Sequence, residues 1–312
     1  MAREKLRELL DGRPVDVLLG GFSNEREVSL VSGGAVADAL EGAGHAVRRV
    51  DVSEAFPEKG RDILAGTGLV FVMLHGRFGE DGEVQQLLEE WDLPYTGSGP
   101  VASRAAMDKV QSKEVFERKG ICTPPWGVYG RDMSPDEIVA QYGLPLVVKP
   151  AASGSSIGVS IVGEAADVEG ALREAEGHGG PVVLEEFIAG RELTIGVLGA
   201  EALPLVELVP KREFYDYDAK YSDDAGTEYV CPAVLDEKLC ESVQAEGLAA
   251  HRALGCRGFS RVDVRLSEEG RCFVLEANTI PGFTSHSLLP KAAAARGISF
   301  SELVERIAEM AL

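Results

Sequence analysis

The sequence predicts an α/β fold that begins with a doubly wound parallel sheet and continues into a part combining helices with antiparallel strands. Between residues 14 and 90, apolar strand-like runs alternate with helix-like stretches, the order that builds a parallel sheet covered by helices. From residue 144 onward, strand-like segments instead return through short turns as hairpins. The 312 residues suffice for two domains or one three-lobed unit. A connector rich in proline and glycine, residues 93–100, marks the first boundary.

The composition is that of a soluble globular protein with a large core, since 45% of the residues are hydrophobic and 26% are charged. The sequence has neither an apolar run long enough to span a bilayer nor a signal pattern at its start, so we expect a cytoplasmic protein without a membrane partner. The formal net charge of −20 argues against nucleic acid as a partner, because phosphate contacts require lysine and arginine patches. The five cysteines lack the spacing of a metal knuckle or redox pair, and we expect them to be reduced.

The first predicted strand, residues 14–21, ends in a glycine pair and leads through a short turn into a helix over residues 30–41. Ser23 and Asn24 are the candidates for the helix N-cap. Such a strand-to-helix turn offers backbone N–H groups and the positive end of a helix dipole to a ligand. Glu25 lies in this turn, where its carboxylate either takes part in ligand binding or only stabilises the helix N-terminus.

The third predicted strand, residues 68–75, ends at His75 and runs into a polar, glycine-rich loop over residues 76–82. Ligands of parallel sheets bind at the carboxyl ends of the strands, which is where both His75 and Glu25 lie. A single histidine is often structural, so a core role and a ligand role remain open for His75. Residues 101–119 follow as one predicted helix.

A lysine at the end of a predicted strand, Lys149, precedes a loop of glycine and serine over residues 151–159. This arrangement suits phosphate binding, because small residues let backbone N–H groups approach oxygen atoms while the lysine supplies a positive charge. The loop lacks the closing Gly-Lys-Ser/Thr of a Walker A motif, and a flexible hairpin tip would have the same composition. The strand at residues 181–188 is either a wall for a flat heterocycle or an ordinary core strand.

Residues 214–221 form a polar segment with four aromatic rings and no periodicity. They belong to a long connection that continues to Cys231. Long loops in compact enzymes are usually functional or disordered. The aromatic rings favour an ordered lid.

Residues 258–287 contain a predicted β-hairpin whose two strands carry alternating polar side chains. Successive side chains on a strand point to opposite faces, so Arg261 shares a face with Asp263. By the same rule Glu276 shares a face with Asn278. If the strands pair with these faces together, their carboxylate and amide oxygens form a patch that suits Mg²⁺, which keeps water ligands and binds phosphates. The alternative is a solvent-facing hairpin, but Glu276 lies between an apolar run and a turn, which favours the metal site.

Several motifs, in one order along nearly the whole chain, make the sequence similar to the D-alanine–D-alanine ligases of the ATP-grasp superfamily. Each motif alone would be modest support. The motifs are GGFSNEREVS at residues 20–29, LHGRFGEDG at 74–82, YTGSG at 95–99, MDK at 107–109, VKP-x5-S-x-G at 148–158, FYDYDAKY at 214–221, RVD at 261–263 and LEANT-x-PG-x-T-x-HS at 275–287.

The resemblance implies an ATP-grasp fold of three domains, for which we expect the ranges 1–103, 104–190 and 191–312, the last two gripping ATP between their sheets. It implies that ATP phosphorylates the carboxylate of one D-alanine, and that the amine of a second D-alanine attacks the acyl phosphate through a tetrahedral intermediate. The product, D-alanyl-D-alanine, is a precursor of peptidoglycan. By analogy with the family we expect a homodimer.

The resemblance also assigns roles at ATP and at two Mg²⁺ or Mn²⁺ ions. The implied metal ligands are Asp263, Glu276 and Asn278. The implied stabilisers of the oxyanion are Arg261 and the backbone N–H of Gly282. The implied ligands of ATP are Lys109, Lys149 and Lys220 for the phosphates, and Glu185, Phe187, Ile188 and Glu192 for adenine and ribose.

The implied substrate contacts divide between the two D-alanines. Glu25 would hold the ammonium of the first, with His75 nearby. Ser155 and Tyr221 would join Glu25 in a hydrogen-bonded set that closes the lid. The second D-alanine and its carboxylate would be received by residues at the end of the last motif, Ser287 and Leu288.

The sequence departs from the family pattern at two positions, and two alternative functions remain to be compared with dipeptide formation. Glu186 stands where many relatives carry a lysine beside the adenine, which puts that side-chain contact in doubt, and Ile280 replaces a small or polar residue without a consequence that we can predict. The acceptor is alternatively D-lactate or D-serine, but the motif at residues 214–221 is similar to that of the dipeptide-forming members. A catalytically silent nucleotide-binding protein would be expected to lack a metal ligand or a phosphate lysine, and neither is missing.

Overall fold

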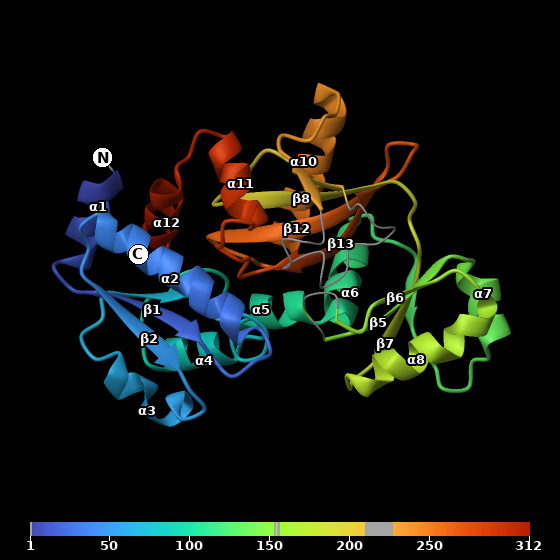
Figure 1. Cartoon of the computed structure of the whole chain (residues 1–312), viewed down its shortest axis with the longest axis horizontal. Helices are drawn as coiled ribbons and strands as arrows, with labels where there is room; N and C mark the ends of the chain where they lie inside the picture. The colour runs from blue at the N-terminus through green and yellow to red at the C-terminus, as the bar shows by residue number, and fades with distance from the viewer. Residues whose placement is uncertain (1, 153, 155–156, 210–226) are drawn as a thin grey trace.

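The computed structural model describes residues 2–152, 154, 157–209 and 227–312, which form three sheets covered by helices (Figure 1). Three residues with predicted roles, Ser155, Lys220 and Tyr221, lie outside the described residues, and so does the whole predicted lid at residues 214–221. In the described part of the chain, no helix is both long and apolar enough to cross a membrane.

The first sheet is parallel and has the strand order β2-β1-β3. Its strands alternate with helices as predicted. Because the strand order reverses after β2, right-handed crossovers place α2 and α3 on opposite faces of the sheet, the doubly wound arrangement (Figure 1). The elements are α1 (Ala2–Leu10), β1 (Val15–Gly20), α2 (Arg26–Gly42), β2 (Val47–Val52), α3 (Phe56–Ile63), β3 (Leu69–Val72) and α4 (Glu83–Glu90).

Helix α2 begins at Arg26, four residues before the predicted start, and its N-cap is Glu25. The predicted caps, Ser23 and Asn24, were therefore wrong. Ser23 has a different use: its hydroxyl donates to the backbone carbonyl of His75 at 2.7 Å and accepts from the backbone N–H of Glu25 at 3.2 Å. These bonds hold the turn after β1 against the end of the strand that leads to His75.

The second sheet is antiparallel, with the strand order β4-β7-β5-β6. The pairing of β5 with β6 confirms the predicted hairpin that carries Lys149 and the Gly/Ser loop. Helix α8 packs on β5, β6 and β7, and with α7 it closes a separate core. The elements are β4 (Trp126–Val128), α7 (Pro135–Tyr142), β5 (Leu146–Pro150), β6 (Ser160–Val162), η1 (Ala165–Asp167), α8 (Val168–Gly177) and β7 (Val182–Glu186).

The third sheet is also antiparallel, with the order β11-β10-β8-β12-β13 and the short β9 paired to β8. Helix α10 packs against β8, β12 and β13, while α11 packs against β8 and β10. The elements are β8 (Arg191–Leu198), β9 (Glu201–Ala202), β10 (Val206–Val209), β11 (Glu228–Val230), α10 (Glu237–Ala253), β12 (Phe259–Leu266), β13 (Cys272–Asn278), α11 (Leu288–Ala295) and α12 (Phe300–Glu309).

The segment predicted as one helix over residues 101–119 forms two helices, α5 (Pro100–Met107) and α6 (Lys109–Lys119). Asp108 interrupts them, because its extended backbone lets the side chain accept hydrogen bonds from the N–H groups of Val110 and Gln111. The break makes Lys109 the first residue of α6 and ties its backbone N–H to the carbonyl of Ala151 at 2.9 Å.

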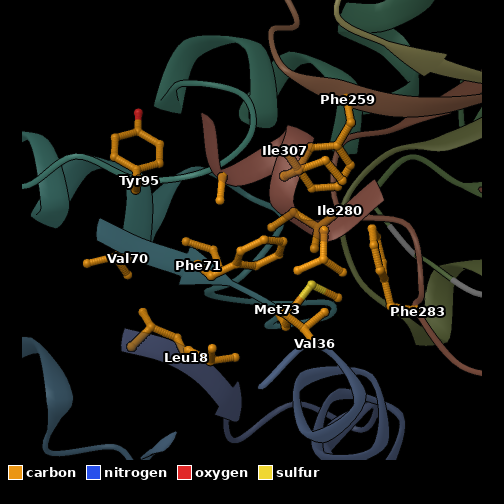
Figure 2. Packing of buried hydrophobic residues seen from close by; sticks show 14 of the residues in the cluster. Leu18, Val36, Val70, Phe71, Met73, Tyr95, Phe259, Ile280, Phe283 and Ile307 are labelled. Carbon is orange, nitrogen blue, oxygen red and sulfur yellow. The ribbon is translucent and has the colours of Figure 1, made fainter. Parts of the chain in front are cut away.

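The first sheet and the C-terminal helices share one hydrophobic core (Figure 2). Phe71 and Met73, from β3 and the residues after it, lie in this core together with Phe283 and Ile307 from the C-terminal part. Ile280 is 2% exposed and points into the same core. Ile280, which departs from the family pattern in the turn after β13, therefore helps to pack the first sheet against the C-terminal helices.

Candidate functional site

A cavity of about 380 Å³ lies where the carboxyl end of the first sheet, the start of α6 and the β12–β13 hairpin meet. Most of the predicted site residues line it, and they come from all three parts of the chain: Glu25, His75, Lys109, Glu192, Arg261, Asp263, Glu276, Asn278, Gly282, Ser287 and Leu288. Other predicted nucleotide ligands are not in its lining, namely Lys149, Glu185, Phe187 and Ile188.

The two strands of the hairpin pair in a register that places their polar faces on the same side of the sheet. Arg261 lies opposite Asn278. Asp263 lies opposite Glu276, and a shift in register follows directly after this pair. The predicted meeting of the two polar faces is therefore confirmed, whereas metal binding by these residues stays a prediction.

Both facing carboxylates have positively charged neighbours. Asp263 pairs with Arg261, whose Nη2 lies 2.8 Å from Oδ2, and accepts a hydrogen bond of 2.7 Å from the Thr194 hydroxyl. Glu276 Oε2 lies 3.3 Å from the ammonium of Lys109 at the start of α6. Two carboxylates that face one cavity beside cations form a set able to exchange those cations for a metal ion.

The chemistry of these side chains fits a hard cation whose remaining ligands come from water and substrate. Among the described residues, no cluster of three or more His, Cys, Asp or Glu side chains is placed to hold a metal. The third protein oxygen would be that of Asn278, whose Oδ1 also accepts a hydrogen bond of 2.9 Å from the backbone N–H of Ile280. Mg²⁺ is commonly held by one or two carboxylates together with water and phosphate oxygens, so the set is sufficient.

The segment between β13 and α11 brings backbone groups to the cavity. A methyl group added at Gly282 would lie 2.8 Å from Ser287 Oγ, so the close approach at this turn depends on glycine. Ser287 is the N-cap of α11 and Leu288 is the first residue of that helix. The N-terminus of a helix presents N–H groups and a positive dipole end, which favour a carboxylate ligand.

Glu25 is approached by two glycine loops. A methyl group added at Gly76 would lie 2.7 Å from Glu25 Oε2, and one added at Gly154 would lie 3.5 Å from the same atom. Gly154 belongs to the Gly/Ser loop after β5, so this loop reaches across to the start of α2. The structure brings Glu25 and Gly154 close together, whereas the predicted set of Glu25 with Ser155 stays a prediction because Ser155 lies outside the described residues.

His75 lies buried in the cavity wall. Burial lowers its pKa to about 4, a backbone hydrogen bond at Ile280 opposes this shift, and the charge of Arg261 adds to it. Its Nε2 lies 3.4 Å from Ser32 Oγ. His75 is therefore neutral near pH 7, so it can offer the substrate a hydrogen bond but no positive charge.

Glu80 is a cavity residue that the sequence reasoning missed, although it belongs to the glycine-rich loop at residues 76–82. Its side chain is buried and accepts a hydrogen bond of 2.6 Å from the backbone N–H of Gly76. Burial, followed by the neighbouring charge of Glu25, raises the pKa of Glu80 well above its usual value. The raised pKa favours the protonated form of Glu80, which adds no second negative charge beside Glu25.

Lys149 and Glu185, predicted as separate ligands of phosphate and adenine, contact each other. Lys149 Nζ lies 2.7 Å from Glu185 Oε1, and Lys113 Nζ lies 2.8 Å from the same oxygen. Burial disfavours the ionised form of Glu185, but the two ammonium groups outweigh it and lower the pKa. Glu185 is therefore a buried anion. Its neighbour Glu186, the departure noted above, is exposed at the end of β7.

Arg265 on β12, another residue that the sequence reasoning missed, connects the remaining predicted nucleotide ligands. Its guanidinium lies over the ring of Phe187 at 5.2 Å, and its Nε donates to the backbone carbonyl of Ile188 at 3.0 Å. Its Nη1 also lies 3.4 Å from Glu192 Oε2. These contacts join the chain after β7 to β8 and β12.

Two family models match the chain. One, described as D-ala D-ala ligase C-terminus, matches residues 115–309, which is more than half of the sequence. The chain belongs to the D-alanine–D-alanine ligase family. The second model, described as D-ala D-ala ligase N-terminus, matches residues 53–98.

Relatives in this family match along nearly their whole length. A D-alanine–D-alanine ligase from Geobacter sulfurreducens is 47% identical over 303 residues, or 96% of this chain and 95% of that protein. The crystal structure of a Bacillus anthracis D-alanine–D-alanine ligase complexed with ATP has 32% identity and a TM-score of 0.83, covering 96% of this chain and 97% of that one. VanG, a D-Ala:D-Ser ligase from Enterococcus faecalis, has 29% identity and a TM-score of 0.82, covering 96% and 99%. The predicted ATP-grasp fold class is confirmed.

Proposed function

We propose that the protein joins two D-alanine molecules to D-alanyl-D-alanine with hydrolysis of ATP to ADP and phosphate, supplying a precursor of peptidoglycan. The observation that carries this proposal is that Glu25, Arg261 and the facing pair Asp263 and Glu276 line one cavity. In the proposed reaction, Glu25 would bind a substrate ammonium and Arg261 a developing oxyanion. Asp263 and Glu276 would help to hold a metal beside the phosphates. The 47% identity to a D-alanine–D-alanine ligase supports the same substrates.

The chemistry requires the first D-alanine to be held while its carboxylate accepts the γ-phosphoryl group. Glu25 would pair with the ammonium, and His75, neutral near pH 7, would hydrogen bond without repelling that cation. The acyl phosphate would then be attacked by the amine of the second D-alanine. Arg261 and the backbone N–H of Gly282 would stabilise the oxyanion of the tetrahedral intermediate, the kind of contribution that is often the largest in acyl transfer.

The second D-alanine would bind at the start of α11. Ser287 and the backbone at Leu288 lie at the N-terminus of this helix, where the dipole and N–H groups attract the substrate carboxylate. This arrangement would direct the amine of the acceptor toward the acyl phosphate. The predicted hydrogen-bonded set of Glu25, Ser155 and Tyr221 would close the site during the reaction.

The nucleotide would bind between the second and third sheets. Lys109, Lys149 and Lys220 are proposed phosphate ligands, which neutralise charge on the transferring phosphoryl group. The proposed adenine and ribose ligands are Glu185, Phe187, Ile188 and Glu192. Two Mg²⁺ or Mn²⁺ ions would be held by Asp263, Glu276 and Asn278, and when bound they would supply positive charge that offsets the charge of the phosphates.

Ligation to another acceptor, D-serine or D-lactate, is the second candidate. The similar TM-scores of the D-alanine–D-alanine ligase and the D-Ala:D-Ser ligase mean that the fold does not distinguish the acceptor. Relatives at 44–47% identity named D-alanine–D-alanine ligase favour D-alanine.

We further propose the domain ranges 1–103, 104–190 and 191–312, since each of the three sheets lies within one of them. We also propose a cytoplasmic homodimer whose partners are the small molecules ATP and D-alanine, with neither nucleic acid nor membrane as a partner. The formal net charge of −20 supports the absence of polyanionic partners. Light scattering of the purified protein tests the dimer.

Phosphate release tests the proposed reaction. With ATP and Mg²⁺, we expect release to depend on D-alanine, and the dipeptide to be found by mass spectrometry. L-alanine should give no release, and D-serine or D-lactate, each supplied with D-alanine, should add no mixed product. If a mixed product formed faster than the D-alanine dipeptide, the acceptor would be D-serine or D-lactate instead of D-alanine. If no phosphate were released with any substrate, ligase activity would be contradicted.

A further inference from the structure

Lys113 is a buried lysine to which none of these roles applies. It lies on α6 one turn after Lys109, and its side chain is 0% exposed. Its ammonium lies 2.8 Å from Glu185 Oε1 and donates to the hydroxyl of Thr123 at 2.7 Å. Burial of an ammonium group is costly even when it is paired, so a lysine at this position calls for an explanation beyond packing.

Lys113 and Lys149 together carry two positive charges against the single carboxylate of Glu185. Lys149 also contacts Glu185 Oε1, at 2.7 Å, so two buried ammonium groups share one carboxylate oxygen. Lys109, on the same helix as Lys113, pairs instead with Glu276. Burial lowers the pKa of Lys113 to about 8. Attraction to Glu185 opposes this shift, whereas repulsion from Lys149 and Lys109 adds to it. One lysine would be enough to balance the negative charge of Glu185, so the second adds an uncompensated positive charge.

The two lysines differ in how firmly they are held. Lys113 has a second partner in Thr123, whose hydroxyl donates in turn to the backbone carbonyl of Val274 on β13 at 2.8 Å. Lys149 lies at the end of β5, directly before the Gly/Ser loop, and its side chain is 8% exposed. Lys149 is therefore the lysine that can turn toward a ligand, while Lys113 stays with Glu185.

We infer that Lys113 is a positioning residue for the nucleotide, which keeps Glu185 paired and in place when Lys149 exchanges this carboxylate for a phosphate. The inference rests on the proposed nucleotide site. Without Lys113, the movement of Lys149 to a phosphate would leave Glu185 as a buried and unpaired anion. Lys149 would then remain with Glu185, and the phosphates would lose one of their ligands.

Binding of ADP and of adenosine to Lys113→Met separates this role from a structural one. Both ligands carry adenine, but only ADP requires Lys149 to move. We expect the Kd of ADP, measured by calorimetry, to rise about tenfold, equivalent to about 1.4 kcal/mol, while the Kd of adenosine changes less than twofold. The variant keeps a balanced pair of Lys149 with Glu185, which favours normal folding, and its melting temperature verifies that.

Two further variants complete the design. Lys119→Met, at an exposed position in the last turn of α6, is the matched control and should bind both ligands as the wild type does. Thr123→Val removes the second partner of Lys113 without burying an unpaired charge. It should raise the Kd of ADP but not that of adenosine, by a smaller factor than Lys113→Met does. Equal losses of ADP and adenosine, or wild-type ADP affinity in Lys113→Met, would overturn the inference. Failure of the wild type to bind ADP would instead contradict the proposed nucleotide site.

The pH dependence of ADP binding is a second readout. The groups that face Lys113 are Glu185 from β7, Lys149 from β5 and Lys109 from its own helix. Since the pKa of Lys113 is about 8, its charge is present at pH 7 and lost by pH 9. We expect the ADP affinity of the wild type to fall across this range and that of Lys113→Met to change less. Parallel profiles in the two proteins would contradict the proposed role of the charge.

Discussion

Replacement of Gly282 with alanine tests the part of the site where we propose that the oxyanion forms. The new methyl group would lie 2.8 Å from Ser287 Oγ, whereas ordinary contacts begin at 3.4 Å, so one of the two groups must move by about 0.6 Å. Ser287 is not free to yield, because its hydroxyl accepts a hydrogen bond of 2.9 Å from the backbone N–H of Thr284 and lies 3.0 Å from the Thr284 hydroxyl. The backbone N–H of Gly282 is therefore displaced.

The size of the effect follows from that displacement. Removal of one oxyanion donor typically lowers kcat by about 10²–10³, and a misplacement of about 1 Å at a reacting centre costs up to about 10²-fold. We expect Gly282→Ala to lower kcat by about 10–100-fold, since the donor is moved rather than removed. The Kd of ADP should stay unchanged, because the nucleotide ligands belong to other segments.

The assay is ADP release at saturating ATP with varied D-alanine, together with calorimetry of ADP. Gly34→Ala is the matched control, because a methyl group at this position of α2 meets no atom within 4 Å. Alanine in place of glycine within a helix should stabilise the control by up to about 1 kcal/mol and leave kcat unchanged. A kcat of Gly282→Ala within twofold of the wild type would refute the proposed oxyanion donor.

Three further predictions concern the metal site, the shared core and a buried histidine. Glu276→Gln removes one of the two facing carboxylates, so turnover at low Mg²⁺ should fall sharply; an unchanged Mg²⁺ titration would contradict its assignment as a ligand. Ile280→Ala removes a fully packed side chain and should lower the free energy of unfolding in urea by about 2–5 kcal/mol, whereas a loss below about 1 kcal/mol would mean that the core does not depend on it. Burial, with a smaller effect of Arg252, lowers the pKa of His251 to about 4 from 6.5, so the unfolded chain takes up a proton first and stability falls as the pH decreases from 6.5 to 4. His251→Gln should remove up to about 3 kcal/mol of this decrease, and equal slopes of unfolding free energy against pH would refute it.

The hairpin at residues 258–287 was predictable because strand alternation is a local property. The side chains of a strand alternate with a period of two, so the positions of Arg261 and Asp263 follow from spacing alone. Every register that differs by two residues brings the polar faces together, so alternation predicted the shared face but not the pairing of Asp263 with Glu276 that the structure has. The parallel sheet at the start of the chain was predictable for a similar reason, since alternation of strands and helices is readable along the sequence.

Helix ends were harder to predict than helices. Residues on both sides of Asp108 have helical composition, so the sequence predicts one continuous helix. The break becomes visible only in the structure, where the side chain of Asp108 caps the N-terminus of α6. In the same way, Ser23 has the composition of an N-cap but is recruited by the carbonyl of His75, a partner 52 residues away. Local signals do not reveal such competition between partners.

The charged residues that the sequence did not reveal all depend on contacts between segments. Lys113 is one of several polar residues on α6 until the packing of that helix places it against Glu185 on β7. Arg265 is an ordinary alternating residue of β12 until the chain after β7 lies beside it. Glu80 gains its perturbed pKa only from burial and from Glu25 across the cavity. A charge pattern indicates such a site only when both partners lie on one element.

The described cations of the proposed phosphate site each have a carboxylate partner. Lys109 pairs with Glu276, and Lys149 shares Glu185 with Lys113. On the proposed assignment, ATP would exchange these pairs, because the lysines would bind phosphate oxygens and Glu276 would help to hold the metal. Lys109 and Glu276 would each exchange their shared contact for one with a ligand of the opposite charge, which offsets the cost of separating the pair. Glu185 is the exception, since no metal is proposed to bind it. Lys113 would keep a positive charge beside Glu185 when Lys149 moves to a phosphate.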